Sequence, residues 1–148
     1  MITTLLIATL TLTNLSTDSA ADLVTAAQNN DVSTVVNAIE NGADVNAANG
    51  LGITPLMVAS KLADLTLFEI LVENGADVNQ RNNAGATAIF IAVRNGNIQA
   101  VARLISHGAD LTIKNNQGHT AHDVALLFDK PVIAAMLKRH HQAQLARM

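Results

Sequence analysis

The feature that most constrains this chain is a period of about 33 residues that recurs through most of its 148 residues. The segment Gly-Ala-Asp stands at 42–44, 75–77 and 108–110. Three residue types recur at the same offset, at Gly52, Gly85 and Gly118, at Thr54, Thr87 and Thr120, and at Ala26, Ala59, Ala92 and Ala125. A fixed period of this length indicates stacked supersecondary units, because one such unit cannot bury its apolar face alone. The sequence therefore predicts a solenoid built from repeats.

The unit that begins near residue 49 indicates what each repeat contains. Thr54 is a good N-cap, and Pro55 suits the first helical position because its missing N–H would have no partner there. We expect a short helix that ends near residues 63–64, where an aspartate can open a second helix over residues 65–73. Asn74-Gly75 closes that helix, since glycine accepts the left-handed conformation at a helix C-terminus. A hairpin then leads to the next repeat.

These segments resemble the ankyrin repeat family, whose unit is a helix–turn–helix of the same period followed by a β-hairpin loop. The matching threonine-containing segments lie at 52–56, 85–89 and 118–121, and Gly-Ala-Asp-Val-Asn lies at 42–46 and 75–79, with an altered copy at 108–112. The resemblance implies an all-α fold, an α-solenoid of stacked ankyrin-type helix-turn-helix repeats joined by β-hairpin loops.

The resemblance covers most of the chain and divides it into repeats. We expect one ankyrin repeat domain over residues 22–141, followed by a C-terminal tail at 142–148. The expected repeats are 22–48, 49–81, 82–114 and 115–141. The last repeat ends in polar residues, as a terminal repeat needs for solubility. The family's usual histidine after Thr-Pro-Leu is replaced by Met57, Phe90 and Asp123, so we expect weaker hydrogen bonds between neighbouring loops.

The segment 1–21 differs from the rest of the chain and has the outline of a secretory signal peptide. Residues 1–15 carry no charged side chain, and Ser19 and Ala21 are the small residues expected before a cleavage site. The apolar stretch is shorter than the ~20 residues that a membrane span needs. We therefore expect a secreted or periplasmic protein. Alternatively, the segment stays uncleaved and packs on the first helix, which would fit a cytoplasmic protein or a host-directed effector.

The composition excludes several classes of protein. Without cysteine, the chain cannot form disulfides or thiolate zinc sites. Its formal net charge of −3 and its pI of about 5.9 give no general attraction for nucleic acid. Aromatic residues make up 2% of the chain, so few side chains could stack on single-stranded bases. We expect no nucleic-acid partner and no stable membrane span.

No pattern in the chain points to catalysis. The sequence has no nucleophile elbow, no P-loop and no dinucleotide-binding glycine motif, and we expect no cofactor. His119 and His122 are three positions apart and could share one helical face, but a metal site would need two further ligands. A small metal-binding or enzymatic protein that uses these two histidines is the alternative. The repeating Asn46 and Asn79 are interpreted as turn residues.

An ankyrin-type solenoid would offer an extended concave side formed by hairpin tips and first helices. The resemblance implies contact positions at Leu51, Ile53, Lys61, Leu62, Arg81, Asn83, Ala84, Ala86, Arg94, Asn95, Lys114, Asn116, Gln117, His119, Leu127 and Phe128. The charges in this set are positive, at Lys61, Arg81, Arg94 and Lys114. We therefore expect a monomeric, non-catalytic module that binds an acidic, partly apolar surface of a protein partner. It would act as an adaptor, an inhibitor or a stabiliser.

Overall fold

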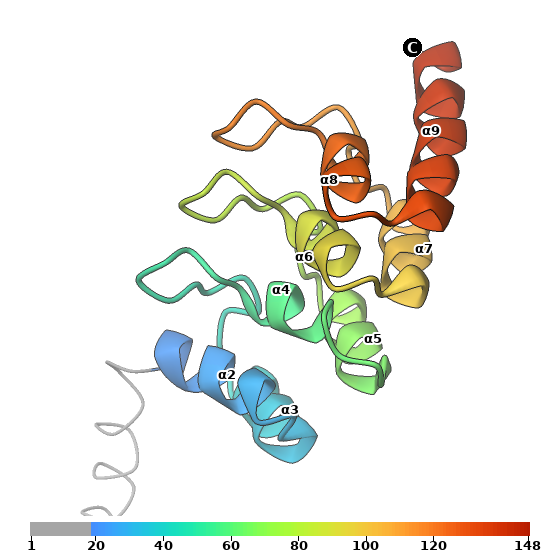
Figure 1. The fold of residues 1–148 in the computed structure, drawn as a ribbon. Helices are drawn as coiled ribbons and strands as arrows, with labels where there is room; N and C mark the ends of the chain where they lie inside the picture. Colours follow the sequence, from blue (N-terminus) through green and yellow to red (C-terminus); the bar gives the residue numbers. More distant parts are fainter. Residues whose placement is uncertain (1–18) are drawn as a thin grey trace, which may run out of the picture.

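The computed structural model describes residues 19–148, and this part of the chain contains eight helices and no β-strand (Figure 1). The helices are α2 (Ser19–Gln28), α3 (Val32–Glu40), α4 (Pro55–Ala59), α5 (Thr66–Glu73), α6 (Ala88–Arg94), α7 (Ile98–Ser106), α8 (Ala121–Leu127) and α9 (Pro131–Ala146). The expected signal segment falls outside the described residues, except that α2 includes the expected cleavage position after Ala21. Within residues 19–148, no helix is long and apolar enough to cross a bilayer.

The helices stack as helix–turn–helix pairs, which confirms the all-α solenoid (Figure 1). The first helices of the pairs, α2, α4, α6 and α8, contact one another in sequence order and form one layer. The second helices, α3, α5, α7 and α9, form a layer behind them. The segments that follow α3, α5 and α7 project on one side of the first helices, and we call them the first, second and third loops.

Local sequence decides where the short helices begin and end. Oγ1 of Thr54 accepts the backbone N–H three positions later at 3.3 Å, and Pro55 takes the first position of α4, as expected. The helix ends at Ala59, earlier than the boundary expected from the sequence. There the Ser60 hydroxyl and backbone N–H both donate to the carbonyl of Leu56, at 2.7 and 2.9 Å. The next helix, α5, begins at Thr66, one position later than expected.

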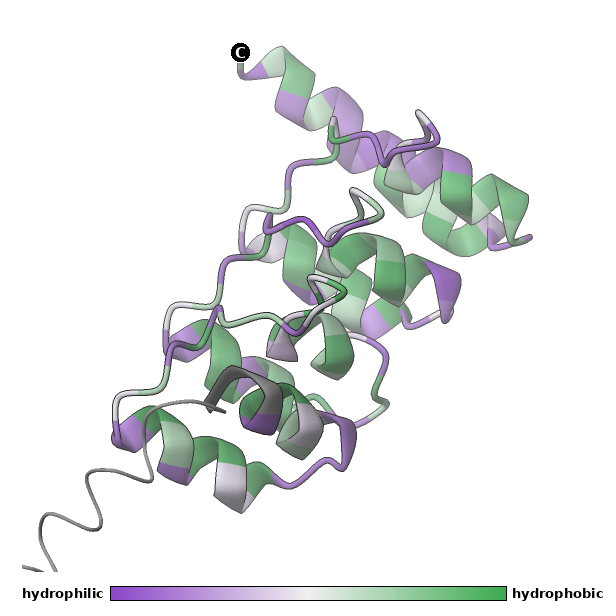
Figure 2. Cartoon of the chain, turned by 90° about the vertical axis from the view of Figure 1, so that its left-hand side faces the viewer, coloured by the Kyte–Doolittle hydropathy of each residue, from purple (hydrophilic) through white to green (hydrophobic). Residues whose placement is uncertain are grey.

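The core is a single apolar layer that runs between the two rows of helices from α2 to α9. Its largest fully buried side chains include Phe68 in α5, Ile89 in α6 and Leu104 in α7. Three of the periodic alanines, Ala59, Ala92 and Ala125, are also fully buried in the first helices. Figure 2 shows the apolar residues gathered in the helices, while the loops carry many polar residues. Stacking thus buries faces that single repeats would expose.

The last helix departs from the expected pattern. It has 16 residues and continues through most of the segment expected to be a polar tail, residues 142–148. In its last turn, Nε2 of Gln144 donates to the carbonyl of Ala109 at 2.9 Å and its Oε1 accepts the N–H of Leu111 at 3.4 Å. The outside of this repeat is also less polar than expected, since Leu126 and Val132 are 59% and 64% exposed.

Candidate partner-binding surface

Each loop tip is built around an asparagine that begins the turn. In the second loop, Oδ1 of Asn82 accepts the N–H groups of Ala84 at 2.9 Å and Ala86 at 3.0 Å. Asn49 and Asn115 accept the corresponding pair of N–H groups in the first and third loops. Side-chain bonds of this kind stabilise a turn without any strand pairing. The three tips therefore share one hydrogen-bonding pattern, which recurs once in each repeat.

A second asparagine in the tips connects neighbouring loops. Nδ2 of Asn83 donates to the carbonyl of Gly50 at 3.0 Å, and its backbone N–H donates to the carbonyl of Leu51 at 3.1 Å. Asn116 repeats both contacts, from Nδ2 to the carbonyl of Asn83 at 2.9 Å and from its N–H to Ala84 at 3.0 Å. We call these four hydrogen bonds the loop ladder. The ladder holds the three tips in fixed register.

The base of the loops is tied by Asn46 and Asn79, which the sequence analysis interpreted as turn residues. Nδ2 of Asn46 donates to the carbonyl of Gly75 at 3.2 Å, and its Oδ1 accepts the N–H of Asp77 at 2.7 Å. Asn79 makes the matching pair of bonds with the following repeat, at 3.3 and 2.8 Å. The interpretation was incomplete. The backbone N–H of each asparagine donates to the aspartate two positions earlier and completes the local turn, while its side chain bonds to the next repeat.

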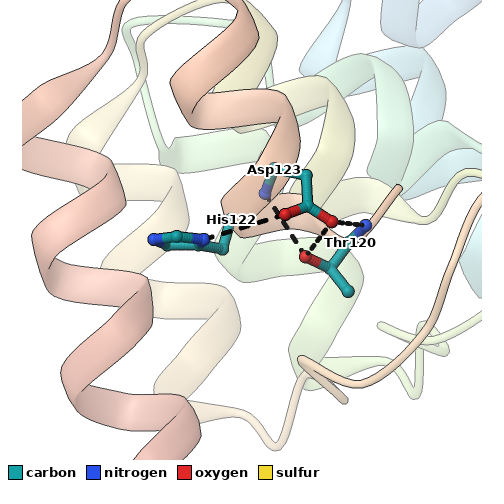
Figure 3. A network of polar contacts seen from close by, with 3 residues as sticks. All are labelled: Thr120, His122 and Asp123. Atoms are coloured by element: carbon teal, nitrogen blue, oxygen red, sulfur yellow. Dashed lines mark hydrogen bonds and ion pairs between the residues drawn. The ribbon is translucent and has the colours of Figure 1, made fainter. Parts of the chain in front are cut away.

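The three residues that replace the family's histidine do not connect the loops. Met57 and Phe90 are buried in the core. The hydrogen bonds between neighbouring loop tips come from the asparagines of the loop ladder. Asp123 forms a capping box with Thr120, since its backbone N–H donates to Oγ1 of Thr120 at 3.3 Å and its Oδ2 accepts the Thr120 N–H at 2.8 Å (Figure 3). The same Oδ2 also accepts the Thr120 hydroxyl at 2.9 Å. These hydrogen bonds, chiefly the one from the backbone N–H, hold the pKa of the Asp123 carboxyl below its usual value of 3.8.

The predicted contact residues fall into two rows. The first row lies in the loops and contains Leu51, Ile53, Arg81, Asn83, Ala84, Ala86, Lys114, Asn116, Gln117 and His119. Most of these side chains are exposed, and Leu51 is 68% exposed. Ile53 and Ala86 are instead half-buried and pack against the core. The structure thus brings the predicted loop positions side by side on neighbouring tips, through the loop ladder.

The second row lies at the turns between the paired helices and contains Lys61, Leu62, Arg94, Asn95, Leu127 and Phe128. Lys61, Arg94 and Leu127 occupy equivalent positions in successive repeats and are all exposed. The guanidinium carbon of Arg94 lies 5.7 Å from the centre of the Phe128 ring, within reach of a cation–π contact. Leu62 is half-buried, and its carbonyl accepts Nδ2 of Asn97 at 2.7 Å.

The four basic residues of the predicted surface are not equivalent. Nη2 of Arg81 donates to the carbonyl of Lys114 at 2.9 Å, so its guanidinium helps to hold two loops together. Arg94 is engaged with the Phe128 ring. Among residues 19–148, neither Lys61 nor Lys114 has a carboxylate oxygen within 4 Å. These two lysines therefore have their charge available for a partner.

The predicted histidine pair gains no further ligand. In the described part of the chain, no group of three or more histidine, aspartate or glutamate side chains is placed to hold a metal ion. Nδ1 of His122 lies 4.0 Å from Oδ1 of Asp123, while His119 lies in the third loop. The geometry thus adds nothing to the metal-binding alternative.

Sequence reasoning missed the asparagines that connect the loops. Their signal was present, because Asn82 and Asn115 are separated by one repeat period, as are Asn83 and Asn116. In a polar turn, however, an asparagine that bonds its own loop cannot be told from one that reaches the next loop without the fold. The structure separates these two roles.

Comparison with known families agrees with this architecture. The family model described as "Ankyrin repeats (3 copies)" matches residues 23–115 and 57–146. A comparison with curated proteins finds no match.

Proposed function

The chain belongs to the ankyrin repeat family, and we propose that it is a non-catalytic module that captures one protein partner on its loops and first helices. Ankyrin repeats are generally protein–protein interaction modules and are typically non-catalytic. Because repeat proteins reuse one scaffold for unrelated partners, the identity of this partner must come from the exposed side chains.

The loop ladder is the observation that carries this proposal. Asn83 and Asn116 fix each tip to the tip before it through both side chain and backbone. A surface that is already ordered loses little conformational freedom on binding, so more of the contact energy appears as affinity. The ladder therefore supports a preformed binding surface rather than loops that order only in the complex.

The exposed side chains of this surface support a particular kind of partner. Lys61 and Lys114 present positive charge on a chain whose formal net charge is −3, and Leu51 adds an exposed apolar group at the first tip. An acidic partner with an apolar patch would complement both features. Binding of this kind would mask, stabilise or recruit the partner, so that the protein acts as an inhibitor, a stabiliser or an adaptor.

We also propose that the protein works outside the cytoplasm, as a monomer. The support is the uncharged stretch of residues 1–15 with Ser19 and Ala21 before the expected cleavage site. Mass spectrometry of the protein isolated from its native host tests the location. A mature N-terminus at Asp22 is expected, and an intact Met1 would contradict the proposal. Sedimentation equilibrium tests the oligomeric state.

The binding proposal is tested with the double variant Leu51→Asp, Lys61→Glu. Neither side chain makes a hydrogen bond or ion pair within residues 19–148, so the variant changes the surface and leaves the loop ladder intact. Reversal at Arg81 is avoided, because its guanidinium holds the Lys114 carbonyl. We expect the affinity for partners captured from the native compartment to fall by at least about tenfold.

The matched control is Arg139→Glu, which reverses an exposed charge on α9, in the layer of second helices. It should leave capture unchanged. Equal affinity of the wild-type protein and the double variant for every captured partner would show that this surface is not the binding site.

A further inference from the structure

The C-terminal end of the solenoid contains a pocket of about 320 Å³. Its walls come from the third loop, the start of α8 and the middle of α9, and its lining residues are Leu111, Lys114, Thr120, Ala121, His122, Asp123, Leu137, Lys138 and His141. This volume is at the lower end of the range for ligand pockets, which is about 300–1,000 Å³. Among residues 19–148, no further helix pair packs on this side of α8 and α9.

The pocket is basic because the last repeat departs from the repeats before it. His122 stands at the position of Leu56 and Ile89, both of which are fully buried. Lys138 likewise stands at the position of Ile105, which packs against the core. These substitutions remove apolar surface from the end of the solenoid. They also place a histidine and a lysine in the lining of the pocket.

The floor of the pocket remains apolar. Leu111, Ala121 and Leu137 line it, and each is at most 4% exposed. These side chains already pack in the core, so the floor is fixed before any ligand arrives. The pocket therefore combines a rigid apolar base with a charged rim.

The charges of the rim favour an anion. In the described part of the chain, neither Lys114 nor Lys138 has a carboxylate oxygen within 4 Å. Asp123 also lines the pocket, but its carboxylate accepts two hydrogen bonds from Thr120 and lies 4.0 Å from Nδ1 of His122 (Figure 3). His141 also lines the pocket, and its Nδ1 is buried with no hydrogen-bond partner within residues 19–148.

We propose that this pocket binds a small organic carboxylate with a short apolar tail. The tail lies on Leu111, Ala121 and Leu137, and the carboxylate faces the ammonium groups of Lys114 and Lys138. Charge-assisted contacts at the rim and apolar contact at the floor are both needed, because either alone is weak in a site this open to water. The pocket shares Lys114 with the proposed partner surface, but Leu51 and Lys61 do not line it.

Three probes separate the two contributions. Hexanoate carries both charge and tail, hexanamide carries the tail without the charge, and acetate carries the charge with almost no tail. The full-length protein is titrated with each, and binding is followed by the amide shifts of the pocket residues in two-dimensional NMR. We expect saturable hexanoate binding with a dissociation constant on the order of 1 mM, and binding at least about tenfold weaker for the other two probes.

Two variants assign the binding to the pocket. Lys114→Gln with Lys138→Gln removes both rim charges and should weaken hexanoate binding at least about tenfold. Lys61→Gln with Arg139→Gln removes the same charge elsewhere and should leave hexanoate binding unchanged. All four side chains are exposed, and circular dichroism of each variant verifies that it is folded.

Several results would overturn the proposal. These are the absence of saturable binding at tens of millimolar hexanoate, equal affinity for hexanamide, shifts spread over surface lysines outside the pocket, or unchanged binding in the Lys114→Gln, Lys138→Gln protein. Loss of partner capture in the Leu51→Asp, Lys61→Glu variant with normal hexanoate binding would separate the two sites.

Discussion

The loop side and the helix side of this solenoid are held together by different forces. Between the helix rows, apolar side chains such as Phe68 and Leu104 are fully buried, and their removal from water stabilises the stack. Between the loops, exposed amide groups such as those of Asn83 and Asn116 bind carbonyls of the preceding repeat. Each such hydrogen bond replaces one with water, so its net contribution is only about 1 kcal/mol.

The difference separates stability from the positioning of the surface. The apolar layer between the helix rows supplies most of the free energy of folding. The loop side contributes little to folding, but it sets the spacing between Leu51 and the exposed residues of the later tips. Substitutions in the apolar layer should therefore lower the free energy of unfolding most. Substitutions in the loops should change it less and should be seen more clearly in hydrogen exchange.

The largest expected effect is that of Phe68→Ala on the helix side. Phe68 is fully buried, and its truncation leaves a cavity between α5 and its neighbours. We expect a loss of about 3–5 kcal/mol in the free energy of unfolding, measured by urea titration. The control is Phe128→Ala, since Phe128 is 46% exposed, and it should cost about 1 kcal/mol or less. Similar costs at both positions would contradict the comparison.

The next effect is that of Gly85→Ala in the second loop. Gly85 has φ +73°, and an added Cβ would lie 2.6 Å from Nη2 of Arg81 and 2.9 Å from the backbone N of Asn116. Gly75→Ala is the matched control, because Gly75 has φ +89° and, apart from its two chain neighbours, no residue in 19–148 comes within 4 Å of the added Cβ. Both should lose about 1–2 kcal/mol to left-handed strain, and Gly85→Ala should lose about 1 kcal/mol more. Equal losses in thermal unfolding would show that the loops move apart freely.

A smaller loss of stability is expected for Asn116→Ala, which removes one side-chain bond of the loop ladder. The free energy of unfolding should fall by about 1 kcal/mol. The more sensitive measurement is hydrogen exchange at the backbone N–H of position 116, which donates to the carbonyl of Ala84 and should lose protection in the variant. Gln117→Ala, in the same tip, removes a side chain that makes no hydrogen bond to any residue in 19–148 and should change neither quantity. Unchanged exchange in Asn116→Ala would indicate that the backbone alone holds the tips.

The smallest effect is that of Asp123→Asn, and it depends on pH. Hydrogen bonds from Thr120 lower the pKa of this carboxyl in the folded protein, so the ionised form stabilises the fold above the unfolded pKa. That contribution is lost as the pH falls through the folded pKa. The wild-type protein should therefore be slightly more stable than the variant at pH 7, and the difference should vanish once the pH is below the folded pKa of Asp123. Glu73→Gln, at an exposed helix end, is the control, and a difference that persists in acid would contradict the assignment.

Much of the fold could be predicted from the sequence because its signals are local and repeated. Thr54 and Pro55 start a helix, and Gly75 ends one, through backbone geometry that involves only a few neighbouring residues. The end of α4 was misplaced, because the bonds from Ser60 to Leu56 are one of several arrangements that a serine allows.

The sites were less predictable. The resemblance located the exposed loop positions, but it could not show that Arg81 is bound to the Lys114 carbonyl while Lys61 makes no ion pair within the described part of the chain. Leu111, His122 and Lys138 share no motif, and they line one pocket only because α9 packs beside α8 and the third loop.

By itself, the sequence determined the repeat period, the pair of helices in each repeat and the caps that begin and end them. A fixed period with caps and glycines at constant offsets leaves little freedom for short helices. The tertiary structure alone decided which polar groups of one repeat meet those of the next, and which residues line the pocket beside α8 and α9. Such contacts join residues about one period apart, and their geometry depends on how closely the helices pack between them.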